Sequence, residues 1–178
     1  MPGQSDIQLT TKDISVLETM LERCDDLDGP FAALLRRKVD HATIFLRDDI
    51  PPCVVTLNSH VIHSANGKQE GPHLIVQCEG PEIPDFALSI HTLDGLALLG
   101  LSEGQATTIS RGDGCQTRLV IEKVTFQPEA DMRDRGYRMA GERLRADNGL
   151  RPSPPMERFH LSEASNQQHR STNDPFHD

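Results

Sequence analysis

Apolar residues near the N-terminus recur every three or four positions, as they do along one face of a helix. This first run is formed by Ile14, Leu17, Met20, Leu21 and Cys24. Thr10 stands three residues before Asp13, the spacing of a capping box, in which each side chain accepts a hydrogen bond from a free backbone N–H of the first turn. The pattern predicts a helix from about Thr11 to Cys24.

A second helical run follows after a short interruption. It consists of Phe31, Leu34, Leu35, Val39, Ala42, Phe45 and Leu46. The Asp28 carboxylate can cap this helix, and Pro30 suits its first turn because the missing N–H has no partner there. Since the interruption is only about five residues long, we expect an antiparallel helical hairpin, which we assign to residues 9–47.

After paired prolines at positions 51 and 52, the pattern becomes that of strands. Five segments of strand length, rich in β-branched residues, are predicted at 53–63, 73–79, 86–91, 105–110 and 116–126. In the last segment, Leu119 and Ile121 share a face, whereas Val124 and Phe126 have the opposite parity. This change of parity predicts a β-bulge near residues 122–123.

Between the third and fourth predicted strands lies a leucine-rich stretch with Leu96, Leu98, Leu99 and Leu101. It is too apolar for a surface loop, so it predicts a short buried helix on one face of the sheet, ended by Gly100 or Gly104. The fold class is therefore α+β, with a helical hairpin followed by an antiparallel sheet with one short helix. We assign the sheet domain to residues 48–130.

The remaining residues, 131–178, carry no strand pattern and few apolar positions. Gly136 and Gly141 interrupt the helical spacing, so we expect a polar, disordered tail with at most one transient helix. The alternative is that the arginines between Arg133 and Arg145 dock on a partner or on the acidic hairpin.

Composition narrows the choice of partners. The net charge is −9, from 27 acids and 18 bases, which disfavours direct binding to nucleic-acid phosphates and favours a basic protein surface. No apolar run approaches the roughly 20 residues of a membrane span, and the start lacks the features of a signal peptide. The four cysteines form no CxxC pair, so we expect reduced thiols and a cytoplasmic protein.

Three motifs, in this order, carry a resemblance to a known family: "RDDIPPCVVTLNSHV", "ALLGL" followed by Glu103-Gly104, and "EKVTFQPEA". Together with the preceding hairpin, they resemble the GreA/GreB family of bacterial transcription elongation factors over roughly residues 9–130. The chain looks most like the short-hairpin Rnk branch, named for regulation of nucleoside diphosphate kinase. Two departures are Leu93, where the family often has proline, and Gln105, where it usually has aspartate.

The resemblance implies an FKBP-like sheet domain and a binding protein rather than an enzyme. Family members attach to RNA polymerase and push the hairpin into its secondary channel. We therefore expect a monomeric transcription regulator without a cofactor, which competes with longer Gre-type factors at the channel. The alternative is an interaction protein that regulates nucleoside diphosphate kinase or nucleotide metabolism through another partner.

Three acids, Asp25, Asp26 and Asp28, lie at the predicted hairpin tip. In longer family members, tip acids help to hold a catalytic magnesium ion, and carboxylates suit that ion. The predicted helices span only about 21 and 25 Å at 1.5 Å per residue, about half the length found in the cleavage factors, so we do not expect cleavage stimulation. Two readings stay open for these acids: a solvated turn that caps the second helix, and an electrostatic contact with basic residues at the channel mouth.

A second candidate partner site is the loop before the short helix, formed by Thr92, Leu93, Asp94 and Gly95. In Gre relatives the corresponding loop touches the rim of the channel. The local alternative is that Thr92 or Asp94 caps the helix, and the two roles are compatible.

The sequence gives little support for a metal site, for prolyl isomerase activity or for a cysteine nucleophile. His60 and His63 are three residues apart, so they point to opposite faces of a straight strand and do not share a metal ion. The sheet domain has Phe86 and Phe126 but neither Trp nor Tyr, which argues against the aromatic pocket of a prolyl isomerase. No local motif pairs a cysteine with a histidine as a nucleophile.

Overall fold

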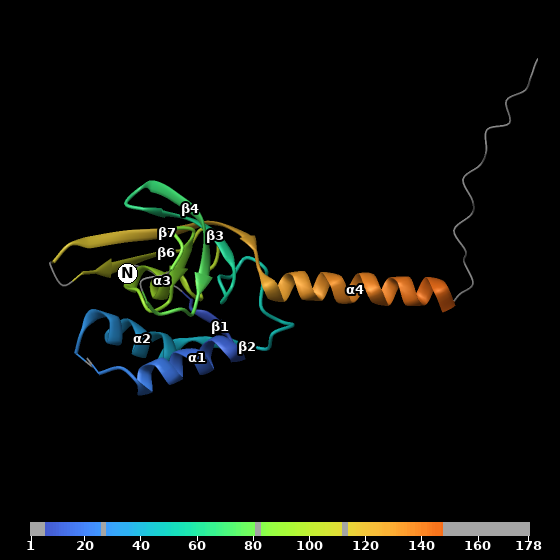
Figure 1. The fold of residues 1–178 in the computed structure, drawn as a ribbon, viewed down its shortest axis with the longest axis horizontal. Coiled ribbons are helices and arrows are strands. Elements are labelled where there is room, and N and C mark those ends of the chain that lie inside the picture. The colour runs from blue at the N-terminus through green and yellow to red at the C-terminus, as the bar shows by residue number, and fades with distance from the viewer. Residues whose placement is uncertain (1–5, 26–27, 81–82, 112–113, 148–178) are drawn as a thin grey trace, which may run out of the picture. The chain divides into compact units, whose positions relative to one another are not determined.

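The computed structural model describes residues 6–25, 28–80, 83–111 and 114–147 of the chain (Figure 1). The chain divides into two compact units, Met1–Gly141 and Glu142–Asp178. Nearly all described residues belong to the first unit. Of the second unit, only the last turns of a helix are described.

The N-terminal hairpin begins with the short strand β1 (Gln8–Thr10) and the helix α1 (Thr11–Glu22). The predicted capping box is confirmed, since the Thr10 side chain accepts a hydrogen bond from the Asp13 N–H at 3.1 Å and the Asp13 carboxylate accepts one from the Thr10 N–H at 3.2 Å. After the loop comes α2 (Pro30–His41). Pro30 occupies the first turn as expected, but the N-cap residue is Gly29, so the prediction that Asp28 caps the helix was wrong.

The second helix is also shorter than predicted. The apolar run continues to Leu46, but the chain leaves the helix after His41 and forms the strand β2 (Thr43–Phe45). β2 pairs in parallel with β1, with Ile44 opposite Leu9. The β-branched Thr43 and Ile44 suit a strand. Their pairing with β1 also gives the β1 backbone hydrogen-bond partners, which a longer α2 would not provide.

The sheet domain contains β3 (His60–Ala65), β4 (Lys68–Val76), β5 (Ala87–Ser89), β6 (Ala106–Ser110) and β7 (Gln116–Phe126). Their order in the sheet is β5-β4-β3-β7-β6. Three of the pairings are antiparallel, but β4 and β5 run parallel. The prediction of a purely antiparallel sheet was therefore wrong, because the connection between β4 and β5 crosses over instead of forming a hairpin.

The predicted bulge in the last strand is confirmed. His63 pairs with Ile121 and Ile62 pairs with Lys123, which leaves Glu122 without an opposite residue. The first predicted strand, in contrast, is largely a linker. Only its last four residues belong to β3, and the earlier ones make an isolated bridge from Val54 to Ser102.

The predicted short helix is α3 (Leu93–Leu98), and it packs against one face of the curled sheet (Figure 1). Gly100 follows it with a φ of +81°, in the left-handed region that favours glycine. A Cβ atom at this position would lie 2.9 Å from the Leu9 Cδ2 atom, so the close approach of β1 also favours glycine. Leu96, Leu98 and Leu99 are fully buried.

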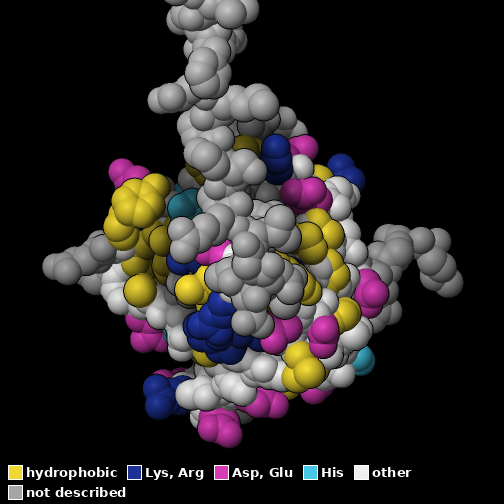
Figure 2. Space-filling model, turned by 90° about the vertical axis from the view of Figure 1, so that its right-hand side faces the viewer, with side chains coloured by type: hydrophobic (Ala, Val, Ile, Leu, Met, Phe, Trp, Pro, Cys, Tyr) yellow, Lys and Arg dark blue, Asp and Glu magenta, His cyan; other side chains and the backbone are white. Residues whose placement is uncertain are grey.

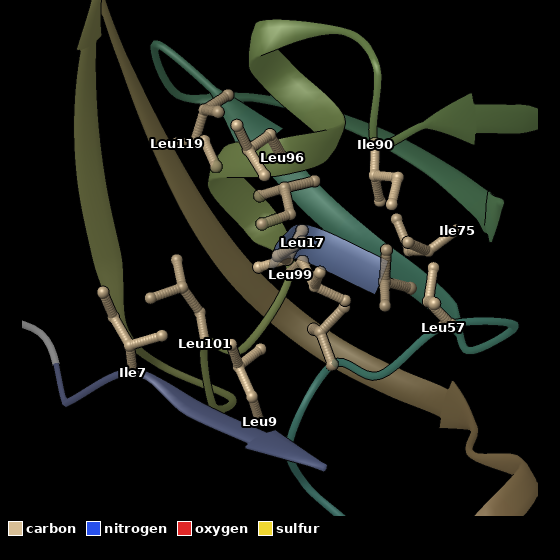
Figure 3. Close-up of a cluster of buried hydrophobic side chains, with 14 of the residues drawn as sticks. Ile7, Leu9, Leu17, Leu57, Ile75, Ile90, Leu96, Leu99, Leu101 and Leu119 are labelled. Carbon is tan, nitrogen blue, oxygen red and sulfur yellow. The ribbon is translucent and has the colours of Figure 1, made fainter. Parts of the chain in front are cut away.

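One hydrophobic core joins the hairpin to the sheet domain. Leu17 of α1 lies beside Leu96 and Leu99, with Ile75 and Leu119 from the sheet around them (Figure 3). Met20 and Leu35 from the two hairpin helices belong to the same cluster. The hairpin thus lies along the sheet domain instead of standing away from it (Figure 1).

A fourth helix, α4 (Pro128–Asp147), follows β7. The structure therefore differs from the expectation of a disordered tail as far as residue 147, and residues 148–178 lie outside the described part of the chain. Gly136 and Gly141 are accommodated within the helix, and Arg135 pairs with Asp131 at 2.7 Å. Within the described ranges, no helix has the length and apolar character needed to cross a membrane.

Candidate partner-binding site

The tip end of the hairpin lies beside the segments that follow β4 and β5. Asp25 and Asp28 are exposed, while Asp26 falls outside the described residues. A cavity of about 390 Å³ lies between this end of the hairpin and those segments. It is lined by Thr19, Met20, Arg23, Cys24 and Phe31 from the hairpin and by Gln77, Glu79 and His91 from the sheet domain. The described tip acids, Asp25 and Asp28, are thus accessible to solvent.

The loop before α3 is held in place by its own polar groups. The Thr92 hydroxyl accepts a hydrogen bond from the Gly95 N–H at 3.2 Å and donates one to the Ser89 carbonyl at 2.7 Å. Thr92 is the N-cap of α3, so the capping role predicted for it is confirmed. Gly95 is buried, and a Cβ atom there would lie 2.1 Å from the Ser89 carbonyl oxygen. Both residues are thus required for the local fold.

Thr92 is the exposed residue of this loop, while Leu93 and Asp94 are half-buried. The Asp94 carboxylate accepts two hydrogen bonds from Arg111, at 3.0 and 2.8 Å. Leu93 is half-buried beside α2. At the other end of the loop, His91 Nδ1 lies 2.7 Å from a Glu79 carboxylate oxygen. Of the predicted partner-site residues, neither Asp25, Asp28 nor the loop residues 92–95 line this cavity, whereas His91, which directly precedes the loop, does.

A buried lysine fastens the hairpin to α3. Lys38 of α2 is 1% exposed, and its ammonium group donates hydrogen bonds to the carbonyl oxygens of Ala97, at 3.2 Å, and Leu99. These carbonyls belong to the C-terminal end of α3, where the helix dipole favours a cation. Burial, and secondarily the neighbouring Arg37, lowers the pKa of Lys38 from 10.5 to about 7. No sequence signal marks this contact, because Lys38 stands in the basic run Arg36-Arg37-Lys38, which is typical of an exposed face.

A buried polar network joins the base of the hairpin to the start of α4. Asp13 accepts a hydrogen bond from the Leu57 N–H at 3.3 Å, and Glu129 accepts one from the Thr56 hydroxyl at 2.7 Å. Burial raises the pKa of Asp13 against the effect of its hydrogen bonds, and the nearby Glu129 charge raises it further. The capping-box motif identified Asp13, but no sequence signal marks its contact with residue 57.

The two histidines of β3 do not come together. His60 is exposed and packs edge-on against Phe126, with ring centroids 5.4 Å apart. His63 is buried against His73, with ring centroids 5.3 Å apart. Burial, followed by the nearby His73, lowers the pKa of His63. In the described part of the chain, no three His, Cys, Asp or Glu side chains are grouped so that they could hold a metal ion.

The chain has a net charge of −9, and Figure 2 shows how charged side chains are distributed over one face. On the face shown in Figure 2, acidic and basic side chains are interspersed and hydrophobic side chains form small separate groups. This face therefore carries no extended acidic surface among the residues that the structure describes.

Comparison with known proteins yields structural matches only. No family model matches the chain, and no curated protein matches it. A solved structure described as a prokaryotic transcription elongation factor GreA/GreB from Nitrosomonas europaea matches with 26% sequence identity and a TM-score of 0.53, over 69% of this chain and 100% of that chain.

Two matches of lower TM-score are to GreA factor homolog 1 (Gfh1). The Thermus thermophilus protein has 14% identity and a TM-score of 0.30, over 68% of this chain and 99% of that chain. Thermus aquaticus Gfh1 has 17% identity and a TM-score of 0.32, over 66% of this chain and 96% of that chain. The match with a TM-score of 0.53 shows that the chain is structurally similar to a GreA/GreB-type transcription factor.

Proposed function

We propose that this protein is a transcription regulator that binds RNA polymerase near its secondary channel and acts by occupying that site, without chemistry of its own. The observation that carries the proposal is the match to a GreA/GreB elongation factor, which spans the whole of that chain and 69% of this one. The hairpin, the sheet and α3 are all contained in the compact unit that ends at Gly141. Such a role would place the protein in the cytoplasm.

The dimensions of the hairpin support a factor that does not stimulate transcript cleavage. α1 and α2 have 12 residues each, which corresponds to about 18 Å at 1.5 Å per residue. This is shorter than the sequence predicted, and both helices are packed into the core. A short, docked hairpin supports assignment to the short-hairpin Rnk branch and competition with longer factors for the channel entrance.

We assign the polymerase contacts to two surfaces. The first is the acidic tip, Asp25, Asp26 and Asp28, whose carboxylates would meet basic residues at the channel mouth. The second is the loop Thr92–Gly95, in which Thr92 is exposed, Leu93 and Asp94 are half-buried, and buried Gly95 allows the close approach of the backbone. No metal ion or other cofactor is required for such binding.

The test is binding of the full chain to purified core RNA polymerase, with and without a long-hairpin Gre factor as competitor. We expect saturable binding that the competitor abolishes, and no shortening of transcripts in arrested elongation complexes. Absence of binding at low salt would refute the proposal. Binding accompanied by transcript shortening would retain the partner and refute the non-cleaving role.

Charge reversal separates the two readings of the tip. The triple variant Asp25→Lys, Asp26→Lys, Asp28→Lys is expected to weaken polymerase binding, with a loss that shrinks as salt is raised. Glu142→Lys is a control that changes an exposed acid outside the proposed surface. If the triple variant binds like the wild type at low salt, the tip is only a solvated turn.

A further inference from the structure

β6 is an edge strand, and half of its backbone groups point away from the sheet. Among the strands that the structure describes, its one neighbour in the sheet is β7. Arg111 donates a hydrogen bond to the Cys115 carbonyl at 2.9 Å, and Ile121 donates one to the Gln105 carbonyl at 3.0 Å. In an antiparallel pair, hydrogen-bonded and non-hydrogen-bonded residues alternate, so the odd-numbered residues of β6 face β7.

The even-numbered residues Thr108 and Ser110 therefore direct their N–H and C=O groups outward. The bonds of the opposite strand agree, because both backbone groups of Arg118, the residue that pairs with Thr108, are bonded to Asn66 on the other side, at 2.9 Å each. Within the ranges that the structure describes, the backbone groups of Thr108 and Ser110 have no hydrogen-bond partner. Such an edge can template a further strand.

A groove runs beside this edge. It has a volume of about 260 Å³ and is lined by Pro30, Ala33, Leu34 and Arg37 of α2, by Leu93 of α3 and by Thr108, Ile109 and Ser110 of β6. The lining is apolar at Leu34, Leu93 and Ile109, and its charged side chain is Arg37. In a chain of net charge −9, this groove thus combines apolar lining residues with one cationic side chain.

We propose that this groove binds a short extended peptide segment of a protein partner, which adds to β6 as a further strand. Its backbone would pair with Thr108 and Ser110, which are two residues, or about 7 Å, apart along the strand. An apolar side chain would contact Leu34 and Leu93, and a carboxylate one or two residues away would pair with Arg37. The partner sequence is thus an alternating one that combines apolar and acidic residues.

An extended segment fits this groove better than a helix does. A helix bonds its own backbone internally, so it would cover the outward groups of Thr108 and Ser110 without pairing them. Burying an unpaired backbone group is unfavourable. An added strand satisfies the same groups, and alternate side chains of a strand point to one side, as contact with the apolar lining residues requires.

Proline substitution at the edge provides the decisive variant. Thr108→Pro removes an outward N–H and leaves the bonds between β6 and β7 in place, and proline is tolerated at such edge positions. Thr108→Ala is the matched control, because it removes the same side chain but keeps the N–H. Both variants are made in the full chain, and their folding is checked by thermal unfolding and by protection of the β7 amides.

The first probe is a displayed library of random short peptides, selected on the wild-type chain. We expect enriched sequences that alternate apolar and acidic residues, with affinity lost by about tenfold in Thr108→Pro and nearly unchanged in Thr108→Ala. Arg37→Glu should weaken the same peptides by about fivefold, whereas Arg36→Glu, outside the groove lining, should not. Peptides that bind Thr108→Pro as well as the wild type, or no enrichment at all, would overturn the proposal.

The second probe is core RNA polymerase, and this arm alone rests on the proposed function. A loss of polymerase binding in Thr108→Pro but not in Thr108→Ala would identify the polymerase as the source of the strand. A wild-type chain that fails to bind polymerase but selects groove-dependent peptides would refute the proposed function and support the groove. The two failures are thus distinguishable.

Discussion

α2 and α4 are both regular helices, but they are stabilised by different contacts. α2 buries Ala32, Leu35 and Lys38 between α1 and α3. In α4 the residues from 134 to 140 are all exposed. A buried apolar stripe packs α2 into the core, whereas α4 shows no buried stripe from residue 134 to residue 140.

The start of α4 shows how a helix without a stripe can still be anchored. Arg133 donates hydrogen bonds to the carbonyl oxygens of Arg47 and Asp48, at 3.3 and 3.2 Å, and Glu129 is bonded to Thr56. Just before the helix, the Gln127 amide donates to the carbonyls of Pro51 and Val54, both at 2.8 Å. These polar contacts hold the linker between hairpin and sheet, and they have no period that a sequence pattern could reveal.

The largest loss of stability is expected for a substitution in α2, the helix that packs into the core. Leu35→Ala in α2 should lower the free energy of unfolding by about 2–5 kcal/mol, because it removes a fully buried side chain and leaves a cavity. Tyr137→Ala in α4 should change it by less than about 0.5 kcal/mol, since Tyr137 is 76% exposed. Urea unfolding of both variants measures the difference. Equal losses would mean that α4 packs on the core.

Lys38 should make the free energy of unfolding depend on pH, whereas the exposed arginines of α4 should not. Its folded pKa of about 7 lies below the unfolded value of 10.5, so between these limits the unfolded chain binds more protons. The free energy of unfolding should therefore rise with pH from about 7 to 10.5, by an amount on the order of a few kcal/mol, and this contribution should be constant below pH 7.

Urea unfolding across this pH range tests the contribution. Lys38→Met keeps an apolar stem in the core and should remove the rise. Lys12→Met, at an exposed lysine, is the matched control and should retain it. A rise that persists in Lys38→Met must come from other groups.

A smaller effect is expected from the start of α1, which has a complete capping box, whereas α2 begins at Gly29 without a side-chain cap. Thr10→Ala should destabilise the protein by about 1 kcal/mol, and Gly29→Asp should stabilise it by a few tenths of a kcal/mol. Thermal unfolding of both variants provides the measurement. A gain in Thr10→Ala would contradict the capping role.

The smallest change in the stability of the whole protein is expected for a substitution within α4. A Cβ atom at Gly136 would meet no other atom within 4 Å, so Gly136→Ala should improve local helix propensity by about 1 kcal/mol. Because this part of α4 makes few contacts, the urea midpoint of the whole protein should change little. Amide exchange in residues 134–140 should slow, while exchange in α2 stays the same. A large shift of the midpoint would show that α4 unfolds together with the core.

Local features of this protein follow directly from the sequence. The capping box at Thr10 and Asp13, the short helix ended by Gly100 and the bulge at Glu122 each depend on a few neighbouring residues or on a change of parity within one strand. Thr92 was recognised as a cap for the same reason. These features involve short-range hydrogen bonds and side-chain periodicity, which the order of residues determines.

Tertiary structure alone decided how these elements meet. The parallel pair of β1 and β2 ended α2 early, and the crossover between β4 and β5 made the sheet mixed. Lys38 lies in a basic run typical of an exposed face, but in the fold its ammonium group is buried and bonded to carbonyl oxygens at the end of α3. The groove likewise exists because α2 lies beside the free edge of β6. Such contacts join residues far apart in the chain, and their free energy depends on packing geometry, which no local pattern encodes.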